Sequence, residues 1–138
     1  MYIILASNSP RRKEILSQLN LKFEVVPSNF EEALVDLKPH ALAEHFAYMK
    51  AQDVYKRLDQ SQQKDCYIIG SDTVVYCSRI MGKPVNDQDA YTMLRELSGR
   101  QHQVISGISV IEVRTGNVTT MHEVTDVWFR ELTDEEIQ

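Results

Sequence analysis

The 138-residue sequence has little cysteine, no long apolar run and no excess of positive charge. Two cysteines are too few for a fold built on several disulfides, which excludes the small disulfide-framework domains. No stretch approaches the roughly 20 consecutive apolar residues that cross a bilayer. The formal net charge of -5 argues against a protein that coats nucleic acid or an anionic membrane, and any anion site must therefore be a concentrated one.

Several sequence signatures are also missing. The start of the chain lacks the basic segment and following apolar segment of a secretory signal, so we expect a cytoplasmic protein. Internal repeats and glycine-rich Walker or Rossmann fingerprints are absent, and the histidines and cysteines lack zinc-ligand spacing. With 43% hydrophobic and 25% charged residues, the chain has the composition of one globular domain over residues 1–138.

Strand-like and helix-like patterns alternate along the chain, which is typical of an α/β fold. We expect strands at 2–6, 23–26, 66–76, 104–113 and 118–129, and helices from residue 10, at about 40–58 and at 87–97. The run 2–6 is nearly all apolar, which suits a strand buried on both faces. Segment 78–84 is expected to be a turn, and Thr133 to Glu136 has the capping-box pattern that begins a helix.

A predicted strand-to-helix turn at residues 5–12, LASNSPRR, places two arginines at the start of a helix. Ser9 precedes Pro10, the favoured order of a capping residue and a first-turn proline. Arg11 and Arg12 oppose the helix dipole, because cations are favoured at the other end. A phosphate would explain them, since both a helix N-terminus and a guanidinium bind phosphate oxygens. The alternative is a capped helix with two solvated arginines.

Asp72 is the second candidate, because it lies in the strand-like run 66–76, which Gly70, Ser71 and Asp72 itself interrupt. A carboxylate there is costly unless it is paired or sits at an opening. With Lys83 after the next turn, it would suit metal-assisted phosphoryl chemistry, in which the acid holds a divalent ion or orients water. The alternatives are a turn-forming aspartate and a solvated lysine.

A further carboxylate comes from the acidic pair at residues 31–32. Glu31 and Glu32 could supply a second metal ligand, since divalent cations such as Mg²⁺ prefer oxygen donors. The alternative is an acidic pair on the surface of a polar connection.

Taken in order, these stretches resemble the Maf family of nucleoside triphosphate pyrophosphatases. The resemblance is carried by LASNSPRRKEIL at 5–16, MKA at 49–51, GSDTVVY at 70–76, GKPVNDQDAYTMLRELSGRQHQVISG at 82–107 and VTDVWFRELTDEEI at 124–137. One such motif would be weak, whereas five in the family's order are specific. The resemblance implies an α/β fold (Maf/Ham1-like), with a mixed twisted sheet flanked by helices around a central nucleotide-binding cleft.

The activity implied by this resemblance is metal-dependent hydrolysis of a nucleoside triphosphate to a monophosphate and pyrophosphate. Carried over by position, Glu32 and Asp72 would bind Mg²⁺ or Mn²⁺ and position or deprotonate the attacking water. The implied partner is the nucleoside triphosphate substrate, with no nucleic acid polymer and no membrane, and a homodimer is left open.

The same resemblance assigns the phosphate contacts. Ser9, Arg11 and Arg12 would cradle the phosphates. Lys50 and Lys83 would contact them too and stabilise the charge that develops on them during reaction, an electrostatic contribution often worth several kcal/mol.

Substrate preference follows from two positions of the family's motifs. Arg11 after the proline and Thr73 after the aspartate resemble the branch that acts on dTTP and UTP, and modified pyrimidine nucleotides are included in this expectation. Asn20 and Ser106 depart from the family's usual glycine and threonine. Family members continue past residue 138 through a segment whose glutamine helps form the nucleotide site, so we expect a domain truncated at its C-terminus. The alternative function is a nucleotide-binding or regulatory protein with little hydrolytic activity.

Overall fold

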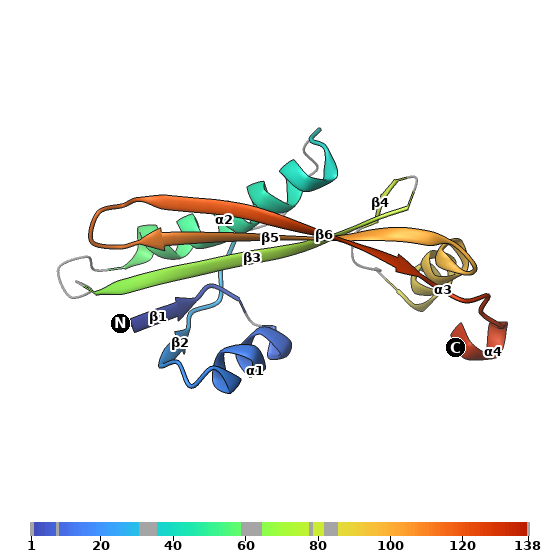
Figure 1. The fold of residues 1–138 in the computed structure, drawn as a ribbon, viewed down its shortest axis with the longest axis horizontal. Helices are drawn as coiled ribbons and strands as arrows, with labels where there is room; N and C mark the ends of the chain where they lie inside the picture. Colours follow the sequence, from blue (N-terminus) through green and yellow to red (C-terminus); the bar gives the residue numbers. More distant parts are fainter. Residues whose placement is uncertain are drawn as a thin grey trace.

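The chain folds into a mixed sheet flanked by helices, as a computed structural model shows for residues 2–7, 9–30, 36–58, 65–77, 79–81 and 86–137 (Figure 1). The strands are β1 (Tyr2–Leu5), β2 (Phe23–Val25), β3 (Cys66–Tyr76), β4 (Ile80–Met81), β5 (Gln101–Glu112) and β6 (Val118–Trp128). The helices are α1 (Pro10–Gln18), α2 (Pro39–Arg57), α3 (Asp87–Leu97) and α4 (Asp134–Ile137). The predicted α/β class is confirmed, whereas the turn expected at 78–84 contains the short strand β4.

The sheet has a parallel part and an antiparallel part, in the order β2-β1-β3-β5-β6. β1 pairs in parallel with β2 on one side and with β3 on the other. β3, β5 and β6 are antiparallel, and β4 pairs with β3. The pairing of β1 with β3 ends where Leu5 faces Ile69, so the rest of β3 extends beyond β1. Where the connections that follow two neighbouring parallel strands run to opposite faces of a sheet, a crevice forms beyond the carboxyl ends of the strands. In α/β proteins ligands bind in this crevice.

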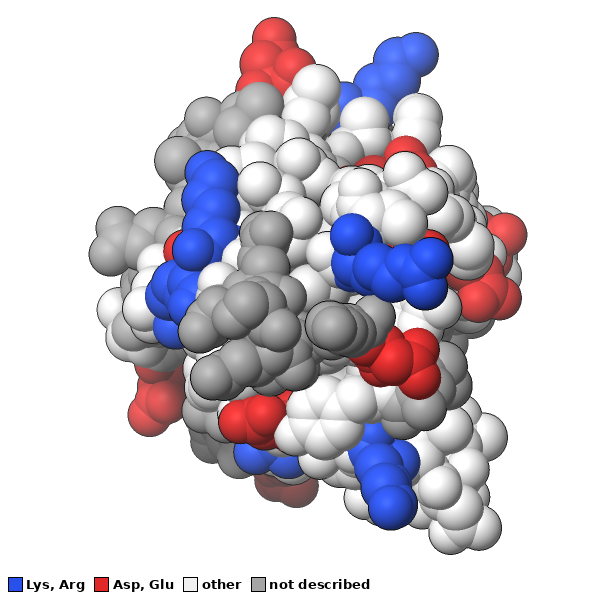
Figure 2. Space-filling view, turned by 90° about the vertical axis from the view of Figure 1, so that its left-hand side faces the viewer, with Lys and Arg blue, Asp and Glu red and all other residues white. Residues whose placement is uncertain are grey.

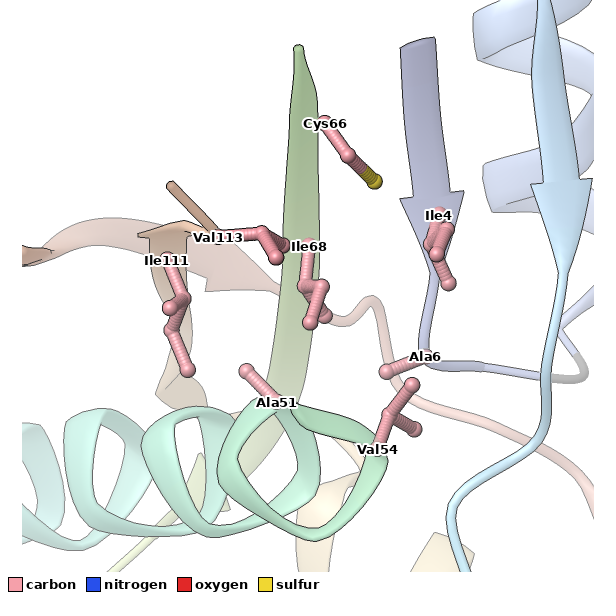
Figure 3. Packing of buried hydrophobic residues seen from close by; sticks show 8 residues of the cluster. All are labelled: Ile4, Ala6, Ala51, Val54, Cys66, Ile68, Ile111 and Val113. Atoms are coloured by element: carbon pink, nitrogen blue, oxygen red, sulfur yellow. The ribbon is translucent and has the colours of Figure 1, made fainter. Parts of the chain in front are cut away.

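The core lies on both faces of the central strands. Ile3 and Leu5 of β1 pack against Leu16 of α1 on one face. On the other face a larger cluster joins β1, β3 and β5 to α2 (Figure 3). Its buried members are Ile4, Ala6, Ala51, Val54, Cys66, Ile68, Ile111 and Val113. Residues 3–6 are all buried, as predicted for a strand covered on both faces, whereas Tyr2 is 36% exposed and β1 ends at Leu5.

Two glycines let α2 lie directly on the backbone of the sheet. A Cβ atom at Gly70 would lie 2.2 Å from the carbonyl oxygen of Ala47, and one at Gly107 would lie 2.3 Å from that of Ala43. Ala43 and Ala47 are fully buried and one helical turn apart, so they face the sheet together. This contact sets the height of α2 above β3 and thereby the position of Lys50.

Asn20 follows α1 with a φ of 55°, in the left-handed region that favours glycine. Asparagine tolerates this conformation better than most other residues, because its short polar side chain can form local hydrogen bonds. The position at which the family resemblance calls for glycine therefore keeps a glycine-like backbone.

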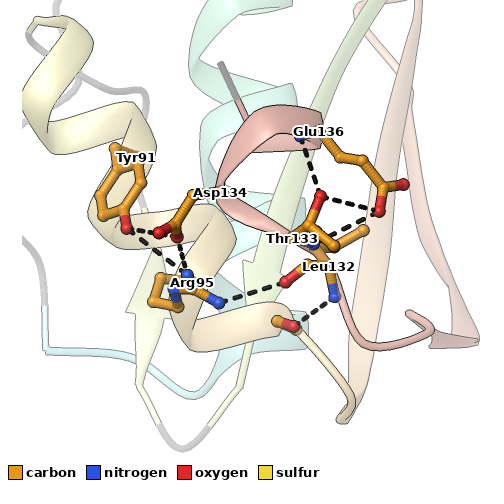
Figure 4. A network of polar contacts seen from close by, with 7 residues as sticks. Tyr91, Arg95, Leu132, Thr133, Asp134 and Glu136 are labelled. Atoms are coloured by element: carbon orange, nitrogen blue, oxygen red, sulfur yellow. Dashed lines mark hydrogen bonds and ion pairs between the residues drawn. The ribbon is translucent and has the colours of Figure 1, made fainter.

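Side-chain contacts hold α4 against α3 (Figure 4). Thr133 Oγ1 accepts a hydrogen bond from the Glu136 amide at 3.3 Å, and Glu136 Oε1 accepts one from the Thr133 amide at 3.3 Å. These two bonds form the predicted capping box. Asp134 accepts a hydrogen bond from Tyr91 Oη at 2.7 Å and forms an ion pair with Arg95, which joins the two helices.

Charged side chains of both signs are interspersed on the face shown in Figure 2. Among the helices of the described residues, none combines the length and the apolar character needed to cross a membrane.

Asp53 of α2 anchors the segment that leads toward Glu32. Its Oδ2 atom accepts hydrogen bonds from the Asn29 amide at 2.8 Å, from Ser28 Oγ at 3.2 Å and from Arg57 Nη2 at 3.1 Å. The Asn29 amide is the main reason why the pKa of Asp53 lies below its ordinary value of 3.8. The anchor therefore depends on an ionised carboxylate.

Asp53→Asn should lower the free energy of unfolding at pH 7 by about 1 kcal/mol, because the amide is a weaker acceptor for these donors. Since the folded-state pKa is lowered, the stabilisation is complete above the ordinary pKa and is lost as the pH falls through the lowered one. Urea unfolding at several pH values should show the difference between variant and wild type shrinking in acid. Glu14→Gln, an exposed change on α1, is the control. A difference that stays constant from pH 7 to acid would contradict this account.

Candidate active site

Asp72 and Lys50 form a largely buried ion pair between β3 and α2. Lys50 Nζ lies 2.9 Å from Asp72 Oδ1, and the two side chains are 18% and 10% exposed. Strand alternation places Asp72 on the same face as Gly70 and Val74, both of which contact α2. A buried charge needs such a partner, because desolvation otherwise costs more than folding can supply. The structure therefore resolves why a carboxylate is tolerated within this strand.

Arg12 reaches the same stretch of β3 from α1. Its Nη1 donates to Ser7 Oγ at 3.1 Å and its Nη2 donates to Thr73 Oγ1 at 3.4 Å. Burial lowers the pKa of Arg12, and the negative charge of Asp72 opposes that effect to a smaller extent. The guanidinium has thus lost hydration, while its hydrogen bonds among the described residues go to neutral hydroxyls. A bound anion would compensate for this loss with charge-assisted hydrogen bonds.

The turn before α1 has the local structure that its sequence predicts. Ser9 is the N-cap, with extended backbone angles, and its hydroxyl accepts from the Arg12 amide at 3.5 Å. The Ser9 amide in turn donates to Ser7 Oγ at 3.2 Å, and Pro10 is the first helical residue. Arg11 is exposed, whereas Arg12 is half-buried, so the two neighbouring arginines occupy different environments.

Five of the eight site residues that the family resemblance implies lie around the end of β1, on β3 and α2 and at the start of α1. These are Ser9, Arg12, Lys50, Asp72 and Thr73. Arg11 lies beside them in sequence on the exposed side of α1. Glu32 and Lys83 fall outside the described residues, so their roles stay predictions. Sequence reasoning gave no role to Ser71, although the strand period predicts that it shares a face with Thr73.

Metal-binding capacity rests on the carboxylates. Within the described ranges no group of three or more His, Cys, Asp and Glu side chains stands ready to hold a metal ion. Asp72 supplies the hard oxygen donors that Mg²⁺ and Mn²⁺ prefer, and it lies at the end of β1 where a polyphosphate could add further oxygens. The donor chemistry of Asp72 therefore fits a divalent cation bound together with a phosphate.

The chain is similar to known proteins over nearly its whole length. The chain matches the Maf-like protein family over residues 2–138. It is 47% identical over 137 residues to a dTTP/UTP pyrophosphatase of Alkaliphilus metalliredigens, a match that covers 99% of this chain and 69% of that protein. A dTTP/UTP pyrophosphatase of Alkaliphilus oremlandii is 46% identical over 136 residues, with 98% and 69% covered. One of Acetivibrio thermocellus is 45% identical over 138 residues, again with 98% and 69% covered. Because the match extends over nearly the whole chain and includes every site residue discussed above, the chain belongs to the Maf-like protein family.

Proposed function

We propose that this chain hydrolyses nucleoside triphosphates to a nucleoside monophosphate and pyrophosphate, and that dTTP and UTP are its substrates. Relatives of 39–47% identity are named dTTP/UTP pyrophosphatases. The observation that carries the proposal is that a half-buried arginine lies beyond the end of β1, close enough to a buried carboxylate–lysine pair for the charge of Asp72 to act on it. That arrangement supplies a carboxylate for metal and water and two cations for phosphates.

Arg12 and Lys50 would bind the triphosphate. A guanidinium offers paired N–H donors that match phosphate oxygens, and an ammonium offers a compact positive charge. Ser9 and the first turn of α1 add the positive end of a helix dipole to the same site. Since the fold holds these groups near one another before substrate arrives, they can stabilise charge that develops on the phosphates during bond cleavage.

Asp72 would hold a divalent cation, Mg²⁺ or Mn²⁺, with Glu32 as the second proposed ligand. When bound, such a cation neutralises phosphate charge and makes a water molecule more acidic. Lys50 Nζ holds Asp72 Oδ1 at 2.9 Å and so fixes the orientation of the carboxylate, which would orient the attacking water or accept its proton. Lys83 is the further cation proposed for the phosphates.

The location and domain organisation follow as part of this proposal. We infer that residues 1–138 act as one domain and that the enzyme works in the cytoplasm. The low cysteine content supports the inference of a reducing compartment.

A pyrophosphate-release assay with Mg²⁺ tests the proposal across dTTP, UTP, dCTP, dATP, dGTP and methylated pyrimidine triphosphates. We expect monophosphate and pyrophosphate in equal amounts, with dTTP and UTP turned over fastest. Release of inorganic phosphate in place of pyrophosphate would show a different bond specificity. Tight triphosphate binding without any product would point to a regulatory nucleotide-binding protein and overturn the proposal.

Arg12→Ala should weaken binding of a non-hydrolysable triphosphate analogue by roughly 1.5–3 kcal/mol, through loss of a charged hydrogen bond. The melting temperature should stay unchanged or rise slightly, because the variant removes a cation from a helix N-terminus. Isothermal titration calorimetry and thermal unfolding give the two readings. Arg79→Ala, which removes an exposed arginine paired with Glu96, should leave the affinity unchanged. Unchanged affinity of Arg12→Ala with a lower melting temperature would mean that Arg12 is structural.

A further inference from the structure

Ser71 of β3 carries a buried hydroxyl that the fold leaves unused. The residue is 7% exposed, and its Oγ atom has no hydrogen-bond partner among the described residues. Such groups are rare in folded proteins, because an unpaired buried hydroxyl has given up its bonds to water without replacement. An unpaired group of this kind calls for an explanation, and a ligand that supplies the missing partner is one.

The strand period and the register place this hydroxyl at the end of β1. Ser71 lies on the same face of β3 as Ile69. Ile69 packs against the cluster that includes Leu5 and Leu16, so this face is the one that α1 covers. Leu5 pairs with Ile69, and the Ala6 amide donates to the Ile69 carbonyl at 2.9 Å. Ser71 is therefore just beyond the last hydrogen bond between β1 and β3, where Ser7 begins the turn to α1.

The side chain of Arg12 lies at the same place in the fold as Ser71. Its guanidinium joins Ser7 Oγ at 3.1 Å to Thr73 Oγ1 at 3.4 Å. Thr73 is the next residue after Ser71 on this face of β3, and Ser7 belongs to the turn next to Ser71. A guanidinium that contacts both Ser7 and Thr73 therefore passes over the position of Ser71. The half-buried guanidinium and the unpaired hydroxyl thus lie at one place in the fold.

We propose that Ser71 is a further substrate-binding residue, whose hydroxyl donates a hydrogen bond to a phosphate oxygen of the bound triphosphate. Phosphate competes successfully for Arg12, because charge-assisted hydrogen bonds are roughly twice as strong as bonds to neutral hydroxyls. When Arg12 turns from Ser7 and Thr73 to the phosphates, a phosphate oxygen can take up a position beside Ser71. This inference rests on the proposed function, since it names a contact to that substrate.

The test compares Ser71→Ala with Ser109→Ala, a change of the same kind on the neighbouring strand. Ser109 pairs with Gly70 in register and is fully buried, but its hydroxyl is hydrogen-bonded to Thr120 at 3.0 Å. Ser71→Ala should raise the dissociation constant of a non-hydrolysable triphosphate analogue about tenfold. Its melting temperature should be unchanged or higher, because the variant removes an unpaired hydroxyl. Ser109→Ala should do the reverse, with a lower melting temperature and unchanged affinity.

The readings separate this inference from the proposed function. If the wild type binds the analogue but releases no pyrophosphate from any triphosphate, the hydrolase proposal fails, and the affinity of Ser71→Ala still decides the role of Ser71. If the wild type is active and Ser71→Ala keeps both its affinity and its kcat/KM, the inference is overturned. A lower melting temperature of Ser71→Ala with unchanged affinity would overturn it as well, because the hydroxyl would then be structural.

Discussion

Asp72→Asn is expected to lower kcat by at least about a hundredfold while the protein stays folded. The amide has nearly the size of the carboxylate and still offers an oxygen to Lys50 Nζ, which lies 2.9 Å from the present carboxylate oxygen. It is, however, a poor ligand for a hard divalent cation and cannot take a proton from water. The loss should therefore fall on transition-state stabilisation and appear in kcat.

The control for this change is Asp126→Asn on β6. Asp126 is exposed, and its nearest described polar partner is Gln103 Nε2 at 3.5 Å, so the same chemical change there touches no proposed site residue. Steady-state kinetics should be measured beside circular dichroism, so that turnover refers to folded protein in both variants. Near-normal kcat in Asp72→Asn would remove Asp72 from the chemistry.

Gly70→Ala is expected to reduce the free energy of unfolding by about 3 kcal/mol. The new Cβ would lie 2.2 Å from the carbonyl oxygen of Ala47 and 2.8 Å from the amide nitrogen of Ala51. Both are backbone atoms of α2, so no side-chain rotation relieves the overlap and the helix itself must move. Urea unfolding monitored by circular dichroism measures the effect.

This displacement should also reduce activity, because α2 carries Lys50 and fixes its contact with Asp72. Gly116→Ala is the matched comparison: its φ of 75° makes the change cost roughly 1–2 kcal/mol from backbone conformation alone, with turnover unchanged. The atom nearest to its new Cβ is the hydroxyl of Tyr55, the far end of a flexible side chain, at 3.3 Å. Wild-type stability of Gly70→Ala would show that α2 does not lie against the backbone of β3 at Gly70.

Residues far apart in the sequence also hold the segment before Glu32, the proposed second metal ligand. Ser28 and Asn29 depend on Asp53, which lies 24 residues after Asn29 on α2. Because Lys50 is on the same helix, one element positions both a proposed phosphate ligand and the approach to the second carboxylate. The close seating of α2 on the two glycines is thus linked to two parts of the site.

Local sequence determined much of the fold. The apolar run at 2–6, the Ser9 cap before Pro10 and the capping box at Thr133 formed as predicted, because each depends on residues within one turn or one strand. The predicted helix at 87–97 and strand at 66–76 also match α3 and β3. The expected interruption at Gly70 did not occur, since β5 pairs with β3 along its length from Tyr67 to Tyr76.

Only the tertiary structure decided which polar side chains meet. Lys50 is 22 residues from Asp72, and nothing in the helical period of α2 indicates which polar position faces that carboxylate. Arg11 and Arg12 have the same local sequence context, yet about 100° of helix rotation between neighbours exposes one and directs the other to Thr73. Which side chain of a helix faces the site depends on the rotation and position of that helix on the sheet. Packing between distant segments sets both, and for α2 the close contact with Gly70 does so.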